Sequence, residues 1–302
     1  MIGTFFHNRD VGSCGSARVR TNNDVPLSQR GKDMADKQLE SNKHLWNTLT
    51  RAHLPSDFYD VEGFRAGRNQ LLPIEISEVG DVRAKSLLHL QCHFGLDTLS
   101  WARLGALVTG VDFSERAIES ARSLAAESAL EAEFICSDIY ALQKVLDRQF
   151  DIVFTSYGVL GWLPDLGKWA RIISHYLKTG GIFYIAEFHP LVYLFNRRSD
   201  GADLFVSRSY FSKAEPEKLL GGCDYASGLK HDLIFYEWQY TLGKVINSLI
   251  RAGLRIQFLH EHPECPCSWF PAMKKDPGHR IWRIEGDPIP LTFSIRAIKP
   301  AP

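Results

Sequence analysis

Hydrophobic and polar positions in the middle of the chain follow two alternating periods. Short apolar runs, which are typical of buried strands, lie at residues 86–90, 107–111, 133–136, 150–155 and 182–187. Between them, apolar residues recur at helical spacing at residues 96–104, 114–126 and 166–177. Strands that alternate with helices in this way predict an α/β fold, namely a doubly wound, Rossmann-like, mostly parallel sheet.

The flanking segments predict additions to this core. Further helices are expected at residues 41–51, with Ser41 as N-cap, and at 71–79 and 242–252. After residue 190 the alternation stops, and an aromatic, irregular stretch with Gly-Gly and Ser-Gly turns predicts a lid of short strands or loops. Two late strands, at 255–260 and 291–298, are expected to pair antiparallel around a proline-rich loop.

One domain is therefore expected over residues 34–302, after a disordered leader or extension at 1–33 that lacks periodicity. The domain divides into an N-terminal helical cover, a ligand-binding core, a lid insertion, and a C-terminal helix with strands. These four parts are predicted at residues 34–80, 86–190, 191–240 and 241–302.

Composition narrows the possible functions. Thirty-five basic residues balance 35 acidic ones, and such a surface argues against binding a nucleic-acid backbone. No apolar run is long enough for a membrane span, and no secretory signal is present, so we expect a cytoplasmic protein without a membrane partner. The six cysteines are scattered apart from Cys265 and Cys267, which predicts free thiols and no metal site. The oligomeric state is left open.

The turn after the first core strand is poor in glycine. His89, Gln91 and His93 stand where a Gly-x-Gly-x-x-Gly turn would carry glycines or an acid, and only Gly95 remains. A dinucleotide pyrophosphate needs close approach to backbone amides at a helix N-terminus, so this turn serves it badly. A nucleoside with a sulfonium and an amino-acid tail needs only the shape of the turn, some amides and a few polar groups.

These residues, with the strand ends that follow, resemble the class I S-adenosylmethionine-dependent methyltransferases. In that family the turn has the form hydrophobic-Asp-x-Gly-x-Gly-x-Gly, so His89 here replaces the acid and Gly95 matches the last glycine. The resemblance implies S-adenosylmethionine as cofactor, contacted in this turn by His89, Gln91 and Gly95. Asp97 or a residue of the N-terminal segment would then meet the methionine amino group.

The resemblance implies further cofactor contacts at the next strand ends. Asp112 would accept both ribose hydroxyls, and Phe113 would pack on the adenine. Asp138 would accept the adenine amino hydrogen, while the backbone of Ile139 meets a ring nitrogen. The remaining expected cofactor contacts are Ser137 and Ser156.

The segment after the fourth strand bears on the methyl acceptor. Thr155-Ser156-Tyr157-Gly158 lacks the Pro-Pro motif of adenine and glutamine amino methyltransferases, which disfavours that chemistry. Tyr157 and Trp162 are expected at the substrate site with Tyr59 or Trp46 from the N-terminal cover, with core packing as the alternative.

Two polar residues follow the fifth strand. His189 is the candidate base, because open sheets place active sites past strand ends, with an ordinary loop hydrogen bond as the alternative. Glu187 is expected to be a buried anchor rather than a base.

Together these features predict an enzyme that transfers a methyl group from S-adenosylmethionine to an O or N, or else S or C, nucleophile of a small molecule. A protein methyltransferase and a catalytically silent S-adenosylmethionine-binding protein are left open as alternatives. The glycine-poor turn and Asp138 argue against an NAD-dependent dehydrogenase.

Overall fold

A seven-stranded sheet in the order β10-β13-β5-β4-β1-β2-β3 forms the centre of the molecule. The computed structural model describes residues 27–197, 204–211, 213, 215–270, 273–276 and 280–301. The strands are β1 (Ser86–Leu90), β2 (Leu107–Asp112), β3 (Ala132–Cys136), β4 (Phe150–Thr155), β5 (Leu177–Phe188), β10 (Arg255–His262) and β13 (Thr292–Ile298). β13 runs antiparallel to both of its neighbours, and the pairs among β1 to β5 are parallel. The predicted doubly wound sheet with an antiparallel C-terminal strand is confirmed.

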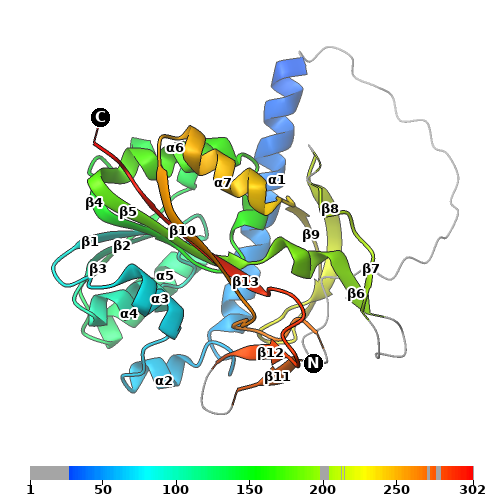
Figure 1. Cartoon of the computed structure of the whole chain (residues 1–302), viewed down its shortest axis with the longest axis horizontal. Helices are drawn as coiled ribbons and strands as arrows, with labels where there is room; N and C mark the ends of the chain where they lie inside the picture. Colours follow the sequence, from blue (N-terminus) through cyan, green and yellow to red (C-terminus); the bar gives the residue numbers. More distant parts are fainter. Residues whose placement is uncertain are drawn as a thin grey trace, which may run out of the picture.

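Helices cover both faces of this sheet (Figure 1). One face carries α3 (Pro73–Val79), α4 (Leu96–Arg103) and α5 (Glu115–Glu127), and the other carries α6 (Leu166–Tyr176), α7 (Leu242–Arg251) and the 3₁₀ helix η1 (Ile139–Lys144). Leu87 of β1 packs with Trp101 on the first face, whereas Leu88 packs with Trp169 on the second. Burial on both faces explains why the core strands are continuous apolar runs.

The long first helix, α1 (Leu27–His53), corrects two predictions. Residues 27–33 are helical, although they were predicted to be disordered, while residues 1–26 lie outside the described residues. Ser41 lies inside the helix and its hydroxyl donates to the Ile234 carbonyl at 2.6 Å, so it is not an N-cap. Residues 34–40 are mostly good helix formers, and the helix therefore continues there without an apolar stripe.

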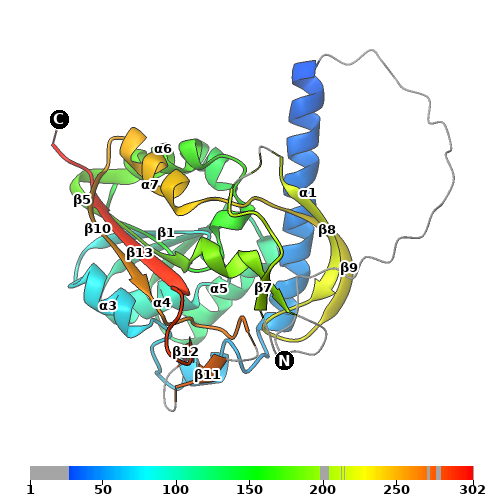
Figure 2. The same ribbon diagram turned by 45° about the vertical axis from the view of Figure 1, so that its right-hand side comes forward.

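The predicted lid contains four short strands and a 3₁₀ helix. They are η3 (Pro190–Leu194), β6 (Phe195–Arg197), β7 (Leu204–Val206), β8 (Glu217–Cys223) and β9 (Lys230–Glu237). The β8–β9 hairpin lies alongside α1 (Figure 2), where Leu45 and Leu49 pack with Leu219 and Phe235. The N-terminal helix and the lid therefore form one cover.

Polar contacts fasten this cover at both ends of the hairpin. The Asn42 side chain donates to the Tyr236 carbonyl and accepts from the Tyr236 N–H, both at 2.8 Å. Nε2 of His53 lies 2.8 Å from Oδ1 of Asp224, and neither side chain is exposed. The pKa of Asp224 is lowered: burial opposes the shift, but hydrogen bonds from His53 and Ser227 outweigh it.

The other elements are small. They are α2 (Val61–Arg65), η2 (Leu160–Trp162), β11 (Met273–Lys275) and β12 (Trp282–Ile284). β11 and β12 form a hairpin inside the segment that was predicted as a proline-rich loop. Within the described residues, no helix is long and apolar enough to cross a membrane.

Candidate active site

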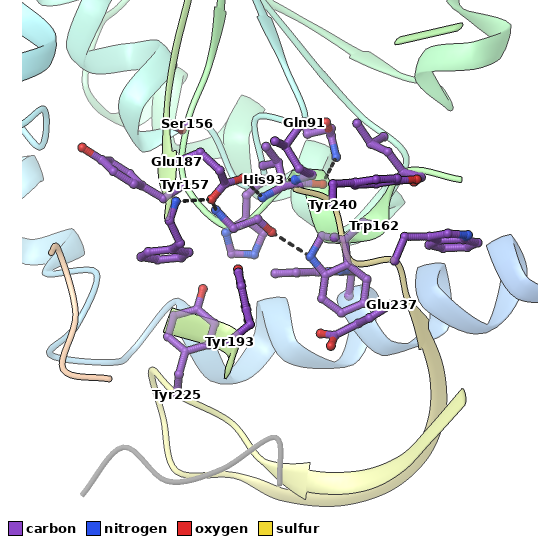
Figure 3. A pocket seen from close by; sticks show the side chains of 18 of the residues that line it. Gln91, His93, Ser156, Tyr157, Trp162, Glu187, Tyr193, Tyr225, Glu237 and Tyr240 are labelled. Carbon is purple, nitrogen blue, oxygen red and sulfur yellow. Dashed lines mark hydrogen bonds between the residues drawn. The ribbon is translucent and has the colours of Figure 1, made fainter. Parts of the chain in front are cut away.

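A cavity of about 960 Å³ opens over the carboxyl ends of β1, β2, β4 and β5, beneath the cover formed by α1 and the lid. It is at the upper end of the usual size for small-molecule sites and has room for more than one ligand. Figure 3 shows Gln91 and His93 on one side of this space and the lid residues Tyr193, Tyr225 and Glu237 on the other. Open parallel sheets bind their ligands at this edge.

The turn after β1 has the positive φ angles that glycine adopts most easily, although it contains few glycines. Gln91, His93 and Gly95 have φ values of 57°, 51° and 80°, all in the left-handed region. A side chain there costs about 1–2 kcal/mol, so Gln91 and His93 are retained against local strain. At Gly95 a Cβ atom would lie 2.7 Å from the Phe134 ring, which explains why this glycine remains.

Gln91 is tied to the loop after β4 and keeps a free acceptor. Its Nε2 donates to the Val159 carbonyl at 3.1 Å. Its Oε1 is buried and has no hydrogen-bond partner among the described residues, although Gln91 lines the cavity. A ligand N–H or O–H would satisfy this oxygen.

His89 lies beneath the turn and does not line the cavity, which corrects the expectation that it contacts the cofactor. Its side chain points under α4 because it shares the face of β1 that carries Leu87. Nδ1 lies 2.8 Å from the Thr98 hydroxyl, and Nε2 lies 3.3 Å from the Ser156 hydroxyl. Burial lowers the pKa of His89 to about 3, so the ring is neutral.

Asp112 ends β2 with its carboxylate in the cavity. Oδ1 accepts from the N–H of Ser114 and Oδ2 from that of His93, each at 2.9 Å. A carboxylate oxygen has two lone pairs, so each oxygen retains one for a ligand hydroxyl. Burial raises the pKa of Asp112 to about 6, although the backbone hydrogen bonds lower it. Ser114 caps α5 as predicted, by accepting from the Ala117 N–H.

The end of β3 contributes the next group of cavity residues. Asp138 caps η1, with Oδ1 accepting from the Tyr140 N–H at 3.1 Å. Burial raises the pKa of Asp138, and this hydrogen bond opposes the rise. The Ser137 hydroxyl donates to the Asp138 carbonyl, so it is available to a ligand only as an acceptor. Phe113 and Ile139 also line the cavity.

Glu187, at the end of β5, anchors the loop after β4. Oε1 accepts from the N–H groups of Gly158 and Phe188, at 2.5 and 2.6 Å, and Oε2 from those of Val159 and Leu160, at 2.8 and 3.1 Å. These contacts saturate the carboxylate, in agreement with the expected anchor. Figure 3 shows it beside Tyr157.

Aromatic side chains line the half of the cavity under the cover. Tyr59 and Tyr225 pair through their hydroxyls, and Trp162 donates from Nε1 to the Gly158 carbonyl at 2.8 Å. The Tyr157 hydroxyl is buried and has no partner in the part of the chain that the structure describes. All the predicted aromatic substrate residues, Trp46 included, thus line the cavity; the other aromatic lining residues include Phe58, Phe188, Tyr193, Phe195, Tyr240, Trp269 and Phe270.

His189 does not line the cavity, which corrects its prediction as the catalytic base. Its Nδ1 accepts from the Leu191 N–H at 3.2 Å, and its Nε2 lies 2.9 Å from Oε1 of Glu261. The backbone turns at Pro190 into η3, and the ring faces Phe293 of the neighbouring strand. The ordinary loop hydrogen bond is therefore the correct alternative.

Several charged cavity residues were missed or only touched on by sequence reasoning. Asp97 lies in the first turn of α4, Glu75 in α3, Arg280 just before β12, and Glu237 at the end of β9. Burial raises the pKa of Glu237 to about 7. Only Asp97 had a signal in the sequence, its place just after the turn. No group of three potential metal ligands occurs among the described residues.

Comparisons with known proteins agree with this geometry. Residues 88–185 match the family model described as a methyltransferase domain. The chain is 24% identical over 228 residues to a ubiquinone biosynthesis O-methyltransferase of Pasteurella multocida, covering 68% of this chain and 94% of that protein. The Coxiella burnetii (strain Dugway 5J108-111) protein of the same name is 29% identical over 136 residues, which cover 44% of this chain and 57% of the relative.

The fold also matches a solved structure. The S-adenosylmethionine-dependent methyltransferase from Mesorhizobium loti superposes with a TM-score of 0.54 at 19% identity, over 78% of this chain and 99% of that one. At this identity the match concerns the fold alone.

Proposed function

We infer that this chain, which is a class I S-adenosylmethionine-dependent methyltransferase, transfers the methyl group to an oxygen or nitrogen nucleophile of a small molecule. The observation that carries the proposal is Asp112 at the end of β2, which presents unused lone pairs to the cavity. The cytoplasmic location and the absence of a nucleic-acid partner stay predictions from the sequence.

The cavity residues fit the chemical groups of this cofactor. We propose that Asp112 accepts the ribose hydroxyls, that Asp138 and the backbone of Ile139 meet the adenine, and that Phe113 packs on the adenine ring. The unpartnered Oε1 of Gln91 and the glycine-like turn ending at Gly95 would lie along the rest of the cofactor. When bound, the cofactor supplies an electrophilic methyl group on a sulfonium, so alignment and desolvation by the protein provide much of the rate.

The aromatic half of the cavity supports an aromatic acceptor. Tyr59, Tyr157 and Trp162 present ring faces and edges, which favour a planar apolar ligand. Oxygen is the acceptor atom in the names of the relatives from Pasteurella and Coxiella, and we extend it to this chain as a proposal. Radiolabelled methyl transfer to a panel of hydroxylated aromatic compounds tests it; labelling of amine-bearing compounds only would contradict it.

Glu237 is our proposed proton acceptor in place of His189. It faces the cavity from β9, and the adjacent Trp238 N–H donates to the Gly161 carbonyl at 2.8 Å, which holds this strand end against the loop after β4. A base with a pKa of about 7 suits a hydroxyl nucleophile at neutral pH. Glu237→Gln should abolish the acidic limb of the kcat profile near pH 7; an unchanged profile would exclude this role.

Calorimetry is the direct test of cofactor identity. The full chain should bind S-adenosylmethionine and S-adenosylhomocysteine and should not bind NAD. A protein that binds neither S-adenosylmethionine nor S-adenosylhomocysteine would refute the proposed function.

A further inference from the structure

The proposed cofactor has an α-ammonium group, which requires an acidic partner in the cavity. Carboxylates around the 91–95 turn are mostly engaged elsewhere. Glu187 is saturated by four backbone N–H groups, while Asp112 and Asp138 hold backbone N–H groups at the ends of β2 and β3. Position 89, where the resembling family has an acid, is a neutral buried histidine.

Asp97 is the remaining carboxylate next to this turn. It lines the cavity from the first turn of α4, and its only hydrogen bond to a described residue is the one that Oδ2 accepts from the Ser156 hydroxyl, at 3.0 Å. Burial raises the pKa of Asp97, although Ser156 and Arg280 lower it. A desolvated carboxylate with a free oxygen is stabilised when a cation pairs with it.

A directed chain of hydrogen bonds holds Asp97 in place. The Ser156 hydroxyl has one hydrogen and donates it to Asp97, so Nε2 of His89 must be the donor to Ser156. In a neutral imidazole, Nδ1 is then the acceptor, and it takes the hydrogen of the Thr98 hydroxyl. Every donor and acceptor in the chain from Thr98 to Asp97 is therefore assigned, and the chain ends at the cavity.

The surroundings of Asp97 carry both signs of charge. Glu75 and Arg280 line the same cavity. Burial is the main cause that raises the pKa of Glu75, and the charge of Asp97 raises it further, whereas the charge of Arg280 lowers it. Oε1 of Glu75 is buried and has no hydrogen-bond partner among the described residues. Oε2 of Glu75 accepts from the Leu72 N–H at 2.6 Å, and Arg280 donates to the Gln70 side chain. Two acids and a guanidinium in one cavity match the ammonium and carboxylate of an amino-acid end.

We propose that Asp97 binds the α-ammonium group of the cofactor and that His89 is a positioning residue, which orients Asp97 through Ser156. The inference rests on the proposed function. It assigns to α4 a contact that the resembling family makes at the end of β1, and it explains how this chain tolerates histidine at position 89.

Two ligands separate this role from a general effect on the cavity. S-adenosylhomocysteine carries the amino-acid end, whereas 5′-methylthioadenosine has the same nucleoside and a thioether but lacks that end. Calorimetry on the full-length Asp97→Asn variant should show affinity for S-adenosylhomocysteine reduced about 10- to 100-fold, the usual effect of losing a hydrogen bond to a charged group. Affinity for 5′-methylthioadenosine should stay within about twofold of wild type.

Controls decide each outcome. Asp232→Asn, at an exposed site on β9, should change neither affinity, and Asp112→Asn should weaken both ligands. Equal loss of both ligands in Asp97→Asn, or no loss of S-adenosylhomocysteine, would overturn the assignment. A wild-type protein that binds neither ligand would instead refute the proposed function.

Variants of Ser156 and His89 test the chain of hydrogen bonds without removing the Asp97 carboxylate. They also test the proposal if Asp97→Asn does not fold. Ser156→Ala should lower the affinity for S-adenosylhomocysteine severalfold and leave 5′-methylthioadenosine unchanged. His89→Gln keeps an amide donor and should retain more selectivity between the two ligands than His89→Phe. If all these variants select between the two ligands as well as wild type does, the positioning role is wrong.

Discussion

Replacing Glu187 with glutamine should destabilise the protein by several kcal/mol, although the change is almost isosteric. The carboxylate accepts two backbone N–H groups on each oxygen. A glutamine amide keeps one oxygen but turns its NH₂ group toward the other two donors. Loss of two hydrogen bonds to a buried charged group, at about 1.5–3 kcal/mol each, gives about 3–6 kcal/mol. This is a large part of the usual 5–15 kcal/mol stability of a domain.

Urea unfolding at pH 8, followed by tryptophan fluorescence, measures this loss. Glu119→Gln is the matched control, because Glu119 is exposed on α5 and its partner is Arg116 on the surface; we expect a change below about 0.5 kcal/mol there. The destabilised loop also carries Tyr157 and Trp162, so methyl transfer by Glu187→Gln should fall even where the variant is folded. A loss of stability below about 1 kcal/mol would show that the four hydrogen bonds do not fix the loop.

Three further predictions concern the cofactor site and the cover. Asp112→Ala should weaken S-adenosylhomocysteine binding by about 1.5–3 kcal/mol in calorimetry, and unchanged affinity would remove the ribose assignment. Affinity of the wild type should fall as the pH drops below about 6, because the protonated Asp112 carboxyl can no longer accept from two hydroxyls; titrations at pH 5 and 7.5 that agree would contradict this. Asp224→Asn keeps one oxygen for His53 but turns an NH₂ group toward the N–H groups of Ala226 and Ser227, and it should lower stability by about 1.5–3 kcal/mol in thermal or denaturant unfolding; a melting temperature equal to that of wild type would mean that the Asp224 carboxylate does not stabilise the cover.

The core of the fold could be predicted because its signals are local. Apolar runs of strand length and the Ser114 cap both act within a few residues of sequence. The N-terminal helix was underestimated because a helix built from good formers on the surface needs no apolar stripe. Its contacts with the β8–β9 hairpin join residues about 190 positions apart in the chain, and its contacts with α5 join residues about 70 positions apart.

The site was predictable where a residue follows directly from the end of a strand, as with Asp112 and Asp138. Closeness to the end of a strand does not by itself bring a side chain to the cavity, and this is why His89 and His189 were misplaced. His89 points beneath α4, since alternate residues of β1 face opposite sides of the sheet. The charged residues Glu75, Arg280 and Glu237 arrive from distant segments, which only the tertiary fold brings to the cavity.

The pairing of Asn42 with Tyr236 has a consequence for solubility. A two-stranded sheet has exposed edges, and a strand with unpaired N–H and C=O groups can recruit a strand of another molecule. Asn42 and Ser41 on α1 occupy the carbonyls of Ile234 and Tyr236 and the N–H of Tyr236 along the free edge of β9. Side chains of the helix thus form the hydrogen bonds that a neighbouring strand would otherwise form with β9. This edge of the hairpin is therefore less available for pairing with a strand of another molecule.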